Sequence, residues 1–273
     1  MKIGLNQWCF GEGAPLNLVF EACARAGVDG VELNLQPSGV QGLTLDSSPA
    51  DVRAIDKQAK AVGLELKSLA TGLLWDFPLS SPDAQVRTMA RSIVRKQLEI
   101  ASWLEMDAVL VVPGVVTPEV SYDECYERSL AELAALVEDA RSFGVKIGIE
   151  NVWNKFLLSP LEMKRYVESV GSSWIGVYFD VGNVLAFGYP EQWIRILGDH
   201  ILKVHVKDFA GAVGNIHGFV PLLSGDVAWP AVLQALQSIG YDDYLTAEYT
   251  PYRHFSSQIA DDVVRQLRCI LGG

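Results

Sequence analysis

Two short apolar runs in the second half of the chain each end on a side chain that can bind a metal ion. The sequence reads WIGVYFDVGN at residues 174–183 and ILKVHVKDF at residues 201–209. The first run ends on Asp180 and the second on His205. Runs this short and this rich in β-branched residues are typical of buried parallel strands. A parallel α/β fold has its chemistry at the carboxyl ends of such strands, where both side chains would lie.

The segments on either side repeat this pattern. Residues 146–149 read KIGI and are followed by Glu150, and residues 245–247 read LTA and are followed by Glu248. Four successive strand ends therefore carry Glu, Asp, His and Glu. We expect the rest of the chain to be the scaffold that points these four side chains at one spot.

Strand-like and helix-like segments alternate along the whole chain, which predicts a parallel sheet with helices packed on it. Further strands are expected at residues 2–8, 30–33, 64–70 and 108–112. Helices are expected at residues 16–26, 49–62, 83–104, 122–143, 160–170, 190–197, 229–239 and 257–271. Eight strand–helix units predict an α/β protein in which residues 1–273 form a single (β/α)8 TIM barrel domain. An open doubly wound sheet is the alternative, and the absence of a G-x-G-x-x-G turn after the first strand counts against it.

The composition favours a well-packed protein and argues against several classes of partner. Hydrophobic residues make up 49% of the 273 residues, and the formal net charge of −11 argues against nucleic acid as a partner. A small phosphorylated substrate is still compatible with this charge, because it needs only a local basic pocket. We expect no signal peptide and no membrane partner, since no apolar run approaches the roughly 18 residues that a membrane span needs. The four cysteines lack CxxC spacing, so we expect reduced thiols and a cytoplasmic protein.

Three carboxylates and one imidazole suit an octahedral divalent ion with open positions better than a structural Zn²⁺ site. Mn²⁺ is the ion most expected, with Mg²⁺, Co²⁺, Fe²⁺ or Zn²⁺ as alternatives. Without a cation, three crowded carboxylates would repel one another and their pKa values would rise. Taken singly, each of these residues is more often a helix cap, a solvated loop residue or a locally hydrogen-bonded histidine. The ordered set on consecutive strands is what favours the metal site.

Several short motifs give the chain a family resemblance. They are Glu150-Asn151, FDVGN at 179–183, HVKD at 205–208, Ala247-Glu248, the KIGLNQW start and the GVEL of the second strand. In these motifs the chain resembles the xylose isomerase-like TIM barrels, the sugar isomerases and epimerases that share their fold with AP endonuclease family 2. The resemblance implies that one divalent metal ion is bound by four residues: Glu150, Asp180, His205 and Glu248. It also implies a homo-oligomer, either a dimer or a tetramer.

A mechanism is implied by the same resemblance, in which Glu150 and Glu248 are the acid/base pair of a ketose 3-epimerase. A ketose would chelate the metal through its C2 carbonyl and C3 hydroxyl, and the metal would stabilise the enediolate that forms when the C3 proton leaves. Carboxylates on opposite sides of the sugar can remove a proton from one face and return one to the other, which inverts C3. The same groups would interconvert an aldose and a ketose, so both reactions stay open.

Two positions depart from the free-ketose 3-epimerases that the chain resembles. Several of those enzymes have a histidine three residues after the metal-binding Asp, where this chain has Asn183. They also have a glutamate six residues after the first metal-binding Glu, where this chain has Phe156. The DVGN form of the motif is more similar to the branch that includes pentulose- and hexulose-phosphate epimerases and isomerases. The substrate is therefore expected to be a small carbohydrate, with or without a phosphate.

Further side chains are candidates for contacts with the sugar. Trp8, Trp75 and Trp153 lie at or just after strand ends, where an aromatic ring can stack on a sugar face or simply pack at the rim of the barrel. The other candidates are polar side chains near the expected mouth: Asn6, Asn183, Lys207, His217 and Arg253. For each of these, a capping or solvated loop position is the alternative. The glycine-rich segment 209–228 is a candidate lid or phosphate pocket.

Three other functions compete with the epimerase or isomerase. A metal-dependent dehydratase of an inosose-like keto-polyol would use the same proton abstraction next to a carbonyl, followed by loss of a hydroxyl. A non-catalytic sugar-binding barrel would bind no metal tightly and would tolerate Glu150→Gln. An AP endonuclease is disfavoured, because its trinuclear zinc site needs many histidines and this acidic chain has four.

Overall fold

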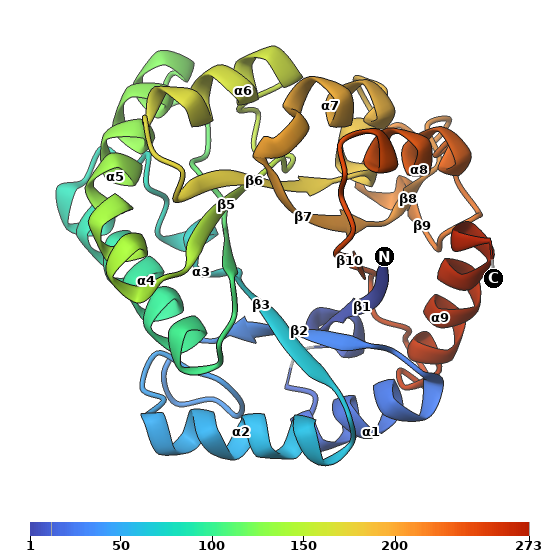
Figure 1. The fold of residues 1–273 in the computed structure, drawn as a ribbon. Coiled ribbons are helices and arrows are strands. Elements are labelled where there is room, and N and C mark those ends of the chain that lie inside the picture. Colours follow the sequence, from blue (N-terminus) through green and yellow to red (C-terminus); the bar gives the residue numbers. More distant parts are fainter. Residues whose placement is uncertain (12, 273) are drawn as a thin grey trace.

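Eight parallel strands form a closed barrel at the centre of the protein, and helices surround it (Figure 1). The computed structural model describes residues 1–11 and 13–272. The barrel strands are β1 (Lys2–Asn6), β2 (Gly30–Leu35), β3 (Glu65–Thr71), β4 (Ala108–Val111), β5 (Lys146–Glu150), β6 (Ile175–Asp180), β7 (Ile201–Val206) and β10 (Tyr244–Ala247). Each strand pairs with the next along the chain, and β10 pairs with β1 to close the barrel. The predicted (β/α)8 barrel is confirmed, and the open doubly wound sheet is wrong.

The helices are α1 (Leu16–Ala26), α2 (Pro49–Ala61), α3 (Leu73–Asp76), α4 (Ala84–Trp103), α5 (Tyr122–Phe143), α6 (Pro160–Ser169), α7 (Pro190–Leu197), α8 (Trp229–Ser238) and α9 (Gln258–Leu271). Most of them form the outer ring in Figure 1, whereas the short α3 lies nearer to the barrel strands. The predicted bounds of α1, α5 and α7 match these; α4 is one residue shorter than predicted at both ends, and α2, α6, α8 and α9 are one residue shorter at one end. Within residues 1–11 and 13–272, no helix combines the length and the apolar character that crossing a membrane requires.

The residues at the two ends of α5 fix where this helix begins and ends. They therefore also fix where β5, the strand with the first site residue, begins. Ser121 is the N-cap of this helix, and its backbone N–H donates to Oε2 of Glu124 at 3.2 Å. Gly144 ends the helix with a φ of 69°, a left-handed conformation that glycine adopts without strain. The N–H of Val145 then donates to the carbonyl oxygen of Ala140 at 3.1 Å. This tight ending directs the chain into β5, which leads to the first site residue.

The hydrophobic core fills the space between strands and helices and continues into the barrel. Strands β2 and β6 are buried along their whole length. Burial on both faces explains why these strands read as nearly continuous apolar runs rather than as alternating patterns. The side chains at the strand ends are therefore held by a rigid, densely packed frame.

The register between neighbouring strands brings the predicted metal ligands to one level. Across β6 and β7, Asp180 pairs with His205. The pairing of these two strands shifts part of the way along, and without this shift Asp180 would pair with Val204. Glu248 follows β10 immediately, and its backbone N–H donates to the carbonyl oxygen of Val206 at 3.1 Å. The carboxyl ends of all these strands open at the same mouth of the barrel.

Two segments outside the predicted strands and helices contain regular structure. Residues 71–82 include the short helix α3. The segment 209–228 forms an antiparallel hairpin with the residue before it, made of β8 (Asp208–Phe209) and β9 (Phe219–Val220). Strands of two residues leave no detectable alternation in the sequence, so the pattern could not predict them. This hairpin follows β7 directly, close to the mouth of the barrel.

Candidate metal centre

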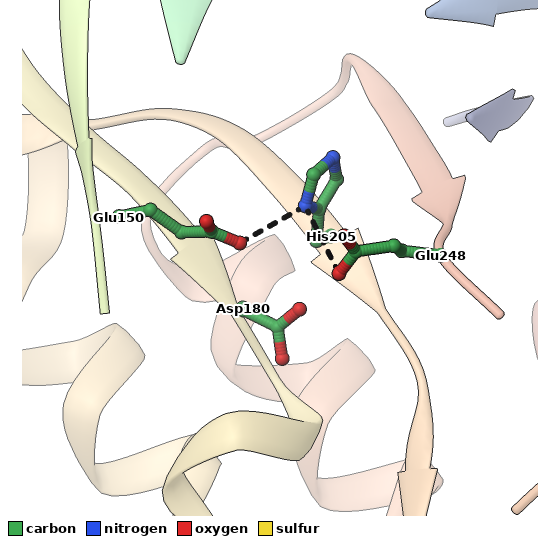
Figure 2. A group of neighbouring side chains, drawn as sticks. All are labelled: Glu150, Asp180, His205 and Glu248. Carbon is green, nitrogen blue, oxygen red and sulfur yellow. Dashed lines mark hydrogen bonds and ion pairs between the residues drawn. The ribbon is translucent and has the colours of Figure 1, made fainter. Parts of the chain in front are cut away.

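Four side chains from neighbouring strands converge at the carboxyl end of the barrel (Figure 2). Glu150 ends β5, Asp180 ends β6, His205 lies in β7, and Glu248 follows β10. Each residue offers one ligand atom, and the four atoms all lie within 4.8 Å of one another. Nδ1 of His205 lies 3.2 Å from Oε1 of Glu150 and 3.8 Å from Oε2 of Glu248. The strand ends thus bring together the residues that their pattern singled out, and binding of a metal there stays a prediction.

Burial and neighbouring charges shift the pKa values of these acids in different directions. Burial raises the pKa of Glu150 to about 7, with a further rise from the carboxylate of Glu248 and an opposing effect of His205. Burial likewise raises the pKa of Asp180. It acts on Glu248 too, but the ammonium of Lys207 and the imidazole of His205 outweigh it and lower the pKa of that carboxyl. A further cation among these groups would relieve the remaining repulsion.

The donor atoms fit a divalent metal ion. Oδ2 of Asp180 is buried and accepts no hydrogen bond from the described residues, although Nζ of Lys207 lies 3.1 Å away as an ion pair. The same ammonium also pairs with Glu248. A buried carboxylate oxygen that accepts no hydrogen bond, and that shares its ammonium partner with a second carboxylate, can take a further cation. Beside two further carboxylates and an imidazole, it forms the oxygen-rich donor set that Mn²⁺ and similar ions prefer.

Two asparagines hold Asp180 in place. The side-chain amide of Asn151 donates to the backbone carbonyl oxygen of Asp180, and its Oδ1 accepts from the Asp180 N–H, both at 2.8 Å. The N–H of Asn183 donates to Oδ1 of Asp180 at 2.7 Å, and its side-chain amide donates to the carbonyl oxygen of Asn151 at 2.9 Å. Asn183 therefore has a structural task at the cluster of Glu150, Asp180, His205 and Glu248, and its predicted contact with the substrate stays a prediction.

One titratable residue next to the cluster is missing from the set that the sequence predicts. Glu32, in the middle of β2, is buried, and its Oε1 lies 2.6 Å from Nε2 of His205. Burial alone would raise the pKa of Glu32, but the charge and hydrogen bond of His205 lower it to about 2. The signal in the sequence was a single acidic residue inside the apolar strand GVELNL, where a charge needs a partner.

A cavity of about 590 Å³ is lined by both glutamates of the cluster. Most of the predicted substrate-contact residues also line it: Trp8, Trp75, Trp153, Asn183 and Lys207. Three others lie elsewhere. Asn6 is buried inside the barrel, where its side-chain amide donates to a carboxylate, and His217 and Arg253 are exposed outside the cavity wall. Contacts of these three residues with a substrate stay predictions that the cavity does not support.

The rest of the cavity wall lies outside the residues that were predicted to contact a substrate. The hairpin of β8 and β9 and the residues after it contribute an apolar side of the wall: Ile216, Phe219, Val220 and Pro221. Trp153 packs against this hairpin, with its ring centroid 5.0 Å from that of Phe219 and 5.4 Å from that of Phe209. Residues 249–252, after β10, also line the cavity, as do Thr71, Leu110, Val112 and Val152. Among the described residues, Lys207 is the one basic side chain that lines the cavity.

The sequence that forms this site matches a known protein family. The sequence model of the family described as xylose isomerase-like TIM barrel matches residues 20–270. The chain belongs to the xylose isomerase-like TIM barrel family. The matched range contains all four residues of the candidate metal centre. The family resemblance of the sequence motifs is therefore confirmed.

Curated relatives of this xylose isomerase-like chain carry the names of epimerases and isomerases with different substrates. The chain is 29% identical over 220 residues, or 79% of its length and 77% of the relative, to an Escherichia coli (strain K12) protein with the provisional name L-ribulose-5-phosphate 3-epimerase. It is 25% identical over 209 residues to the 2-epi-5-epi-valiolone 7-phosphate 2-epimerase of an Actinoplanes species, with 76% and 73% covered. It is 24% identical over 262 residues to the inosose isomerase of Bacillus subtilis (strain 168), with 91% and 88% covered. These names confirm the prediction of an enzyme of the epimerase and isomerase type.

Solved structures share the barrel. A D-tagatose 3-epimerase-like protein matches with a TM-score of 0.82 at 22% identity, over 100% of this chain and 99% of that one. A D-psicose 3-epimerase solved in the presence of D-fructose matches with a TM-score of 0.76 at 20% identity, over 100% and 97%. The IOLI protein, solved with a zinc atom, matches with a TM-score of 0.75 at 20% identity, over 99% and 96%. At these identities, the likeness shows the fold alone.

Proposed function

We propose that the protein is a divalent-metal-dependent epimerase or isomerase that acts on an uncharged ketose. The observation that carries this proposal is the convergence of Glu150, Asp180, His205 and Glu248 in one cluster, whose two glutamates line a cavity of about 590 Å³. Membership of the family supports the reaction class, because relatives carry the names of sugar epimerases and isomerases. We propose Mn²⁺ as the native ion, with Mg²⁺, Co²⁺, Fe²⁺ and Zn²⁺ as alternatives.

The four side chains would hold the ion through three carboxylate oxygens and Nδ1 of His205. Bound there, a divalent ion would polarise the carbonyl of the sugar and make the adjacent C–H more acidic. Glu150 and Glu248 line the cavity, so both carboxylates can also touch the substrate. Asp180 and His205 are fully buried and lie outside the cavity wall, so their task is to bind the metal.

Proton transfer is the task of the two glutamates. Glu150 and Glu248 approach the centre of the cluster from opposite sides (Figure 2). A carboxylate on one side of the sugar can remove the proton from the carbon next to the carbonyl, and a carboxyl group on the other side can return one to the opposite face. This exchange inverts the stereocentre. A single carboxylate that moves the proton between two neighbouring carbons would interconvert an aldose and a ketose instead.

The wall of the cavity favours a substrate without a phosphate group. Lys207 is the one basic side chain on this wall within the described residues, and its ammonium is already engaged by Asp180 and Glu248. Indole and phenyl rings make up much of the remaining wall, and such rings pack against the C–H faces of sugars. A phosphate dianion would need charge-assisted hydrogen bonds that this wall does not offer. Because some relatives are named for phosphate esters, a phosphorylated ketose is the alternative that the assay must exclude.

Dehydration of an inosose-like keto-polyol is the second candidate reaction. It begins with the same removal of a proton next to a carbonyl, and then needs a proton donor at the leaving hydroxyl. The ammonium of Lys207 lies on the cavity wall beside Glu248 and can supply that proton.

The non-catalytic sugar-binding barrel has no feature of the cavity in its favour. The single domain, the cytoplasmic location and the homo-oligomer stay predictions.

Turnover in D₂O tests the proposed function. The protein is stripped with EDTA, reloaded with Mn²⁺ and incubated with pentuloses, hexuloses and their phosphates. We expect conversion of an uncharged ketose, with deuterium incorporated at the carbon that loses its proton. Glu248→Gln removes one acid/base group and should lower turnover by about 100- to 10,000-fold. Glu65→Gln changes a half-exposed carboxylate at the other end of the barrel and should keep full turnover.

Each outcome bears on a different part of the proposal. Loss of water from a keto-polyol without epimerisation would favour the dehydratase. A preference for a phosphate ester would contradict the uncharged substrate and leave the reaction class intact. A wild-type protein that neither binds Mn²⁺ nor converts any substrate would contradict the proposed function as a whole.

A further inference from the structure

A second buried polar cluster lies inside the barrel, at the edge of the His205 ring that faces away from the metal-binding residues. It contains Glu32, which contacts Nε2 of His205, whereas Nδ1 of the same ring faces Glu150 and Glu248. The other members come from three further strands and are all buried: Asn6 of β1, Ser68 of β3 and Tyr178 of β6. None of these members lines the cavity, so the cluster has no direct contact with a substrate.

Both carboxylate oxygens of Glu32 accept hydrogen bonds from this cluster. Oε1 accepts from the side-chain amide of Asn6 at 2.6 Å. Oε2 accepts from the hydroxyl of Ser68 at 2.6 Å and from the hydroxyl of Tyr178. An ionised carboxylate offers only acceptors. In the remaining contact, where Nε2 of His205 lies 2.6 Å from Oε1, the proton must therefore belong to the imidazole.

A proton held on Nε2 decides what the other ring nitrogen can do. A neutral imidazole with its hydrogen on Nε2 presents the lone pair of Nδ1, which is the form that binds a metal through Nδ1. The ring of Tyr178 packs against the imidazole with centroids 4.6 Å apart and an interplanar angle of 57°. This packing keeps the His205 ring in the orientation that points Nδ1 into the metal-binding cluster.

We propose that Glu32 is a positioning residue of the metal site, which fixes the orientation and the Nε2–H form of His205 so that Nδ1 becomes the metal ligand. The inference rests on the proposed function, because it assumes that the metal-binding cluster holds an ion. Carboxylates that accept the second N–H of a metal-binding histidine orient that ligand, and their replacement typically costs about 10- to 100-fold in metal affinity. Glu32 therefore belongs to the metal site without touching metal or substrate.

Two substitutions of Glu32 separate the loss of its charge from the loss of its acceptor. Glu32→Gln keeps one acceptor oxygen for Nε2–H and should weaken Mn²⁺ binding by about 10-fold. Glu32→Met has a similar length and no acceptor, and should weaken it by about 100-fold. Affinity is measured by competition with a fluorescent chelator. Glu132→Gln, which alters a mostly buried carboxylate paired with Arg87 and Arg91 between the outer helices α4 and α5, is the matched control and should keep the wild-type affinity.

A second readout does not depend on the metal. In the metal-free protein labelled with ¹⁵N-histidine, Nε2–H of His205 should exchange slowly with water, because it is buried and hydrogen-bonded to Glu32. Glu32→Met should abolish this slow exchange, while Glu132→Gln should retain it. Tyr178→Phe removes one donor to Glu32 and serves as a milder variant, with a smaller loss of Mn²⁺ affinity.

The outcomes distinguish this inference from the proposed function. Mn²⁺ affinity within two-fold of wild type in Glu32→Met, or an Nε2–H of His205 that exchanges freely in the wild-type protein, would overturn the inference. If Glu32→Met does not fold, the same thresholds apply to Glu32→Gln and to the exchange of the wild-type N–H. Failure of the wild-type protein to bind Mn²⁺ would overturn the proposed function first, before any variant is compared.

Discussion

The side chain of Asn151 and the backbone of Asp180 exchange two hydrogen bonds of 2.8 Å across the ends of β5 and β6. The amide of Asn151 thereby extends the pairing of the two strands past Glu150, where the ladder of backbone bonds ends. Both residues are buried, so water is not available to replace these bonds. The position of the Asp180 carboxylate thus depends on Asn151, whose side-chain amide and oxygen both bond to the backbone of Asp180.

Asn151→Ala should therefore damage the metal-binding cluster as well as the fold. It leaves the N–H and the carbonyl oxygen of Asp180 buried without these partners, which costs about 1–3 kcal/mol in the free energy of unfolding. We expect Mn²⁺ binding to weaken by about 10-fold, because Asp180 is no longer fixed. Asn154→Ala is the control, since Asn154 is equally buried but bonds to Gly114 and Phe156. Urea unfolding and Mn²⁺ titration should show similar destabilisation for both variants and weaker metal binding for Asn151→Ala alone.

Mn²⁺ should stabilise the folded protein. A ligand that binds only the native state adds about 2.7 kcal/mol at 100 times its Kd, which corresponds to a rise in Tm of roughly 5–10 °C for a chain of this size. Asp180→Asn removes one anionic ligand and should lose most of this rise, whereas Glu65→Gln at the other end of the barrel should retain it. Differential scanning fluorimetry with and without EDTA makes the comparison. An unchanged rise in Asp180→Asn would place the bound ion elsewhere.

Binding of a metal ion should release protons, and the number released per ion should be larger at low pH. Burial raises the pKa of Glu150 to about 7, so below pH 7 this carboxyl carries a proton that a cation must displace. The carboxylate of Glu32 and the neighbouring acids outweigh burial and raise the pKa of His205 well above its usual value, so Nδ1 must also lose its proton. We expect about two protons released per ion below pH 7 and about one above it. Calorimetry in buffers of different ionisation enthalpy counts them, and equal release at pH 6 and pH 8 would contradict this prediction.

Asp208 anchors the hairpin that forms one side of the cavity. Its Oδ1 accepts from the N–H groups of Phe209 at 2.9 Å and Val227 at 3.1 Å, and its Oδ2 accepts from the indole N–H of Trp229 at 3.1 Å. Asp208→Ala leaves these three buried N–H groups without an acceptor. The substitution should cost about 3 kcal/mol in the free energy of unfolding. We expect faster proteolysis within residues 209–227 and a higher KM, with Mn²⁺ affinity unchanged.

A nearby carboxylate provides the comparison for this anchor. Asp226 accepts from the N–H of Gly211 at the exposed side of the same segment. Asp226→Ala should therefore change stability and proteolysis much less than Asp208→Ala. Proteolysis that is equally fast in both variants would show that Asp208 is not the anchor.

The cluster of the candidate metal centre could be predicted from the sequence because topology alone brings its residues together. In a parallel barrel every strand ends at the same mouth, so the residue that follows each apolar run is located as soon as the run is recognised. Glu150, Asp180 and Glu248 stand at such positions, and their convergence required no knowledge of side-chain contacts. Trp8 and Trp153 follow the same rule and line the cavity.

Residues inside the strands could not be placed in this way. The direction of a side chain within a barrel strand depends on strand tilt and on the stagger between strands, which the sequence pattern does not give. Glu32 was therefore missed, and Asn6 was expected at the mouth although its side chain turns into the barrel toward Glu32. The hairpin of β8 and β9 was missed for a different reason, because its strands are too short for a pattern.

Three of the seven tryptophans in the chain line a single cavity. Trp8, Trp75 and Trp153 come from segments that follow β1, β3 and β5, so their indoles surround the space where a sugar would bind. Indole emission responds to the loss of water and to a change of neighbours. The intrinsic fluorescence of the protein is therefore weighted toward the mouth of its barrel, and the molecule has an optical reporter of its own by which the arrival of a ligand can be timed without a label.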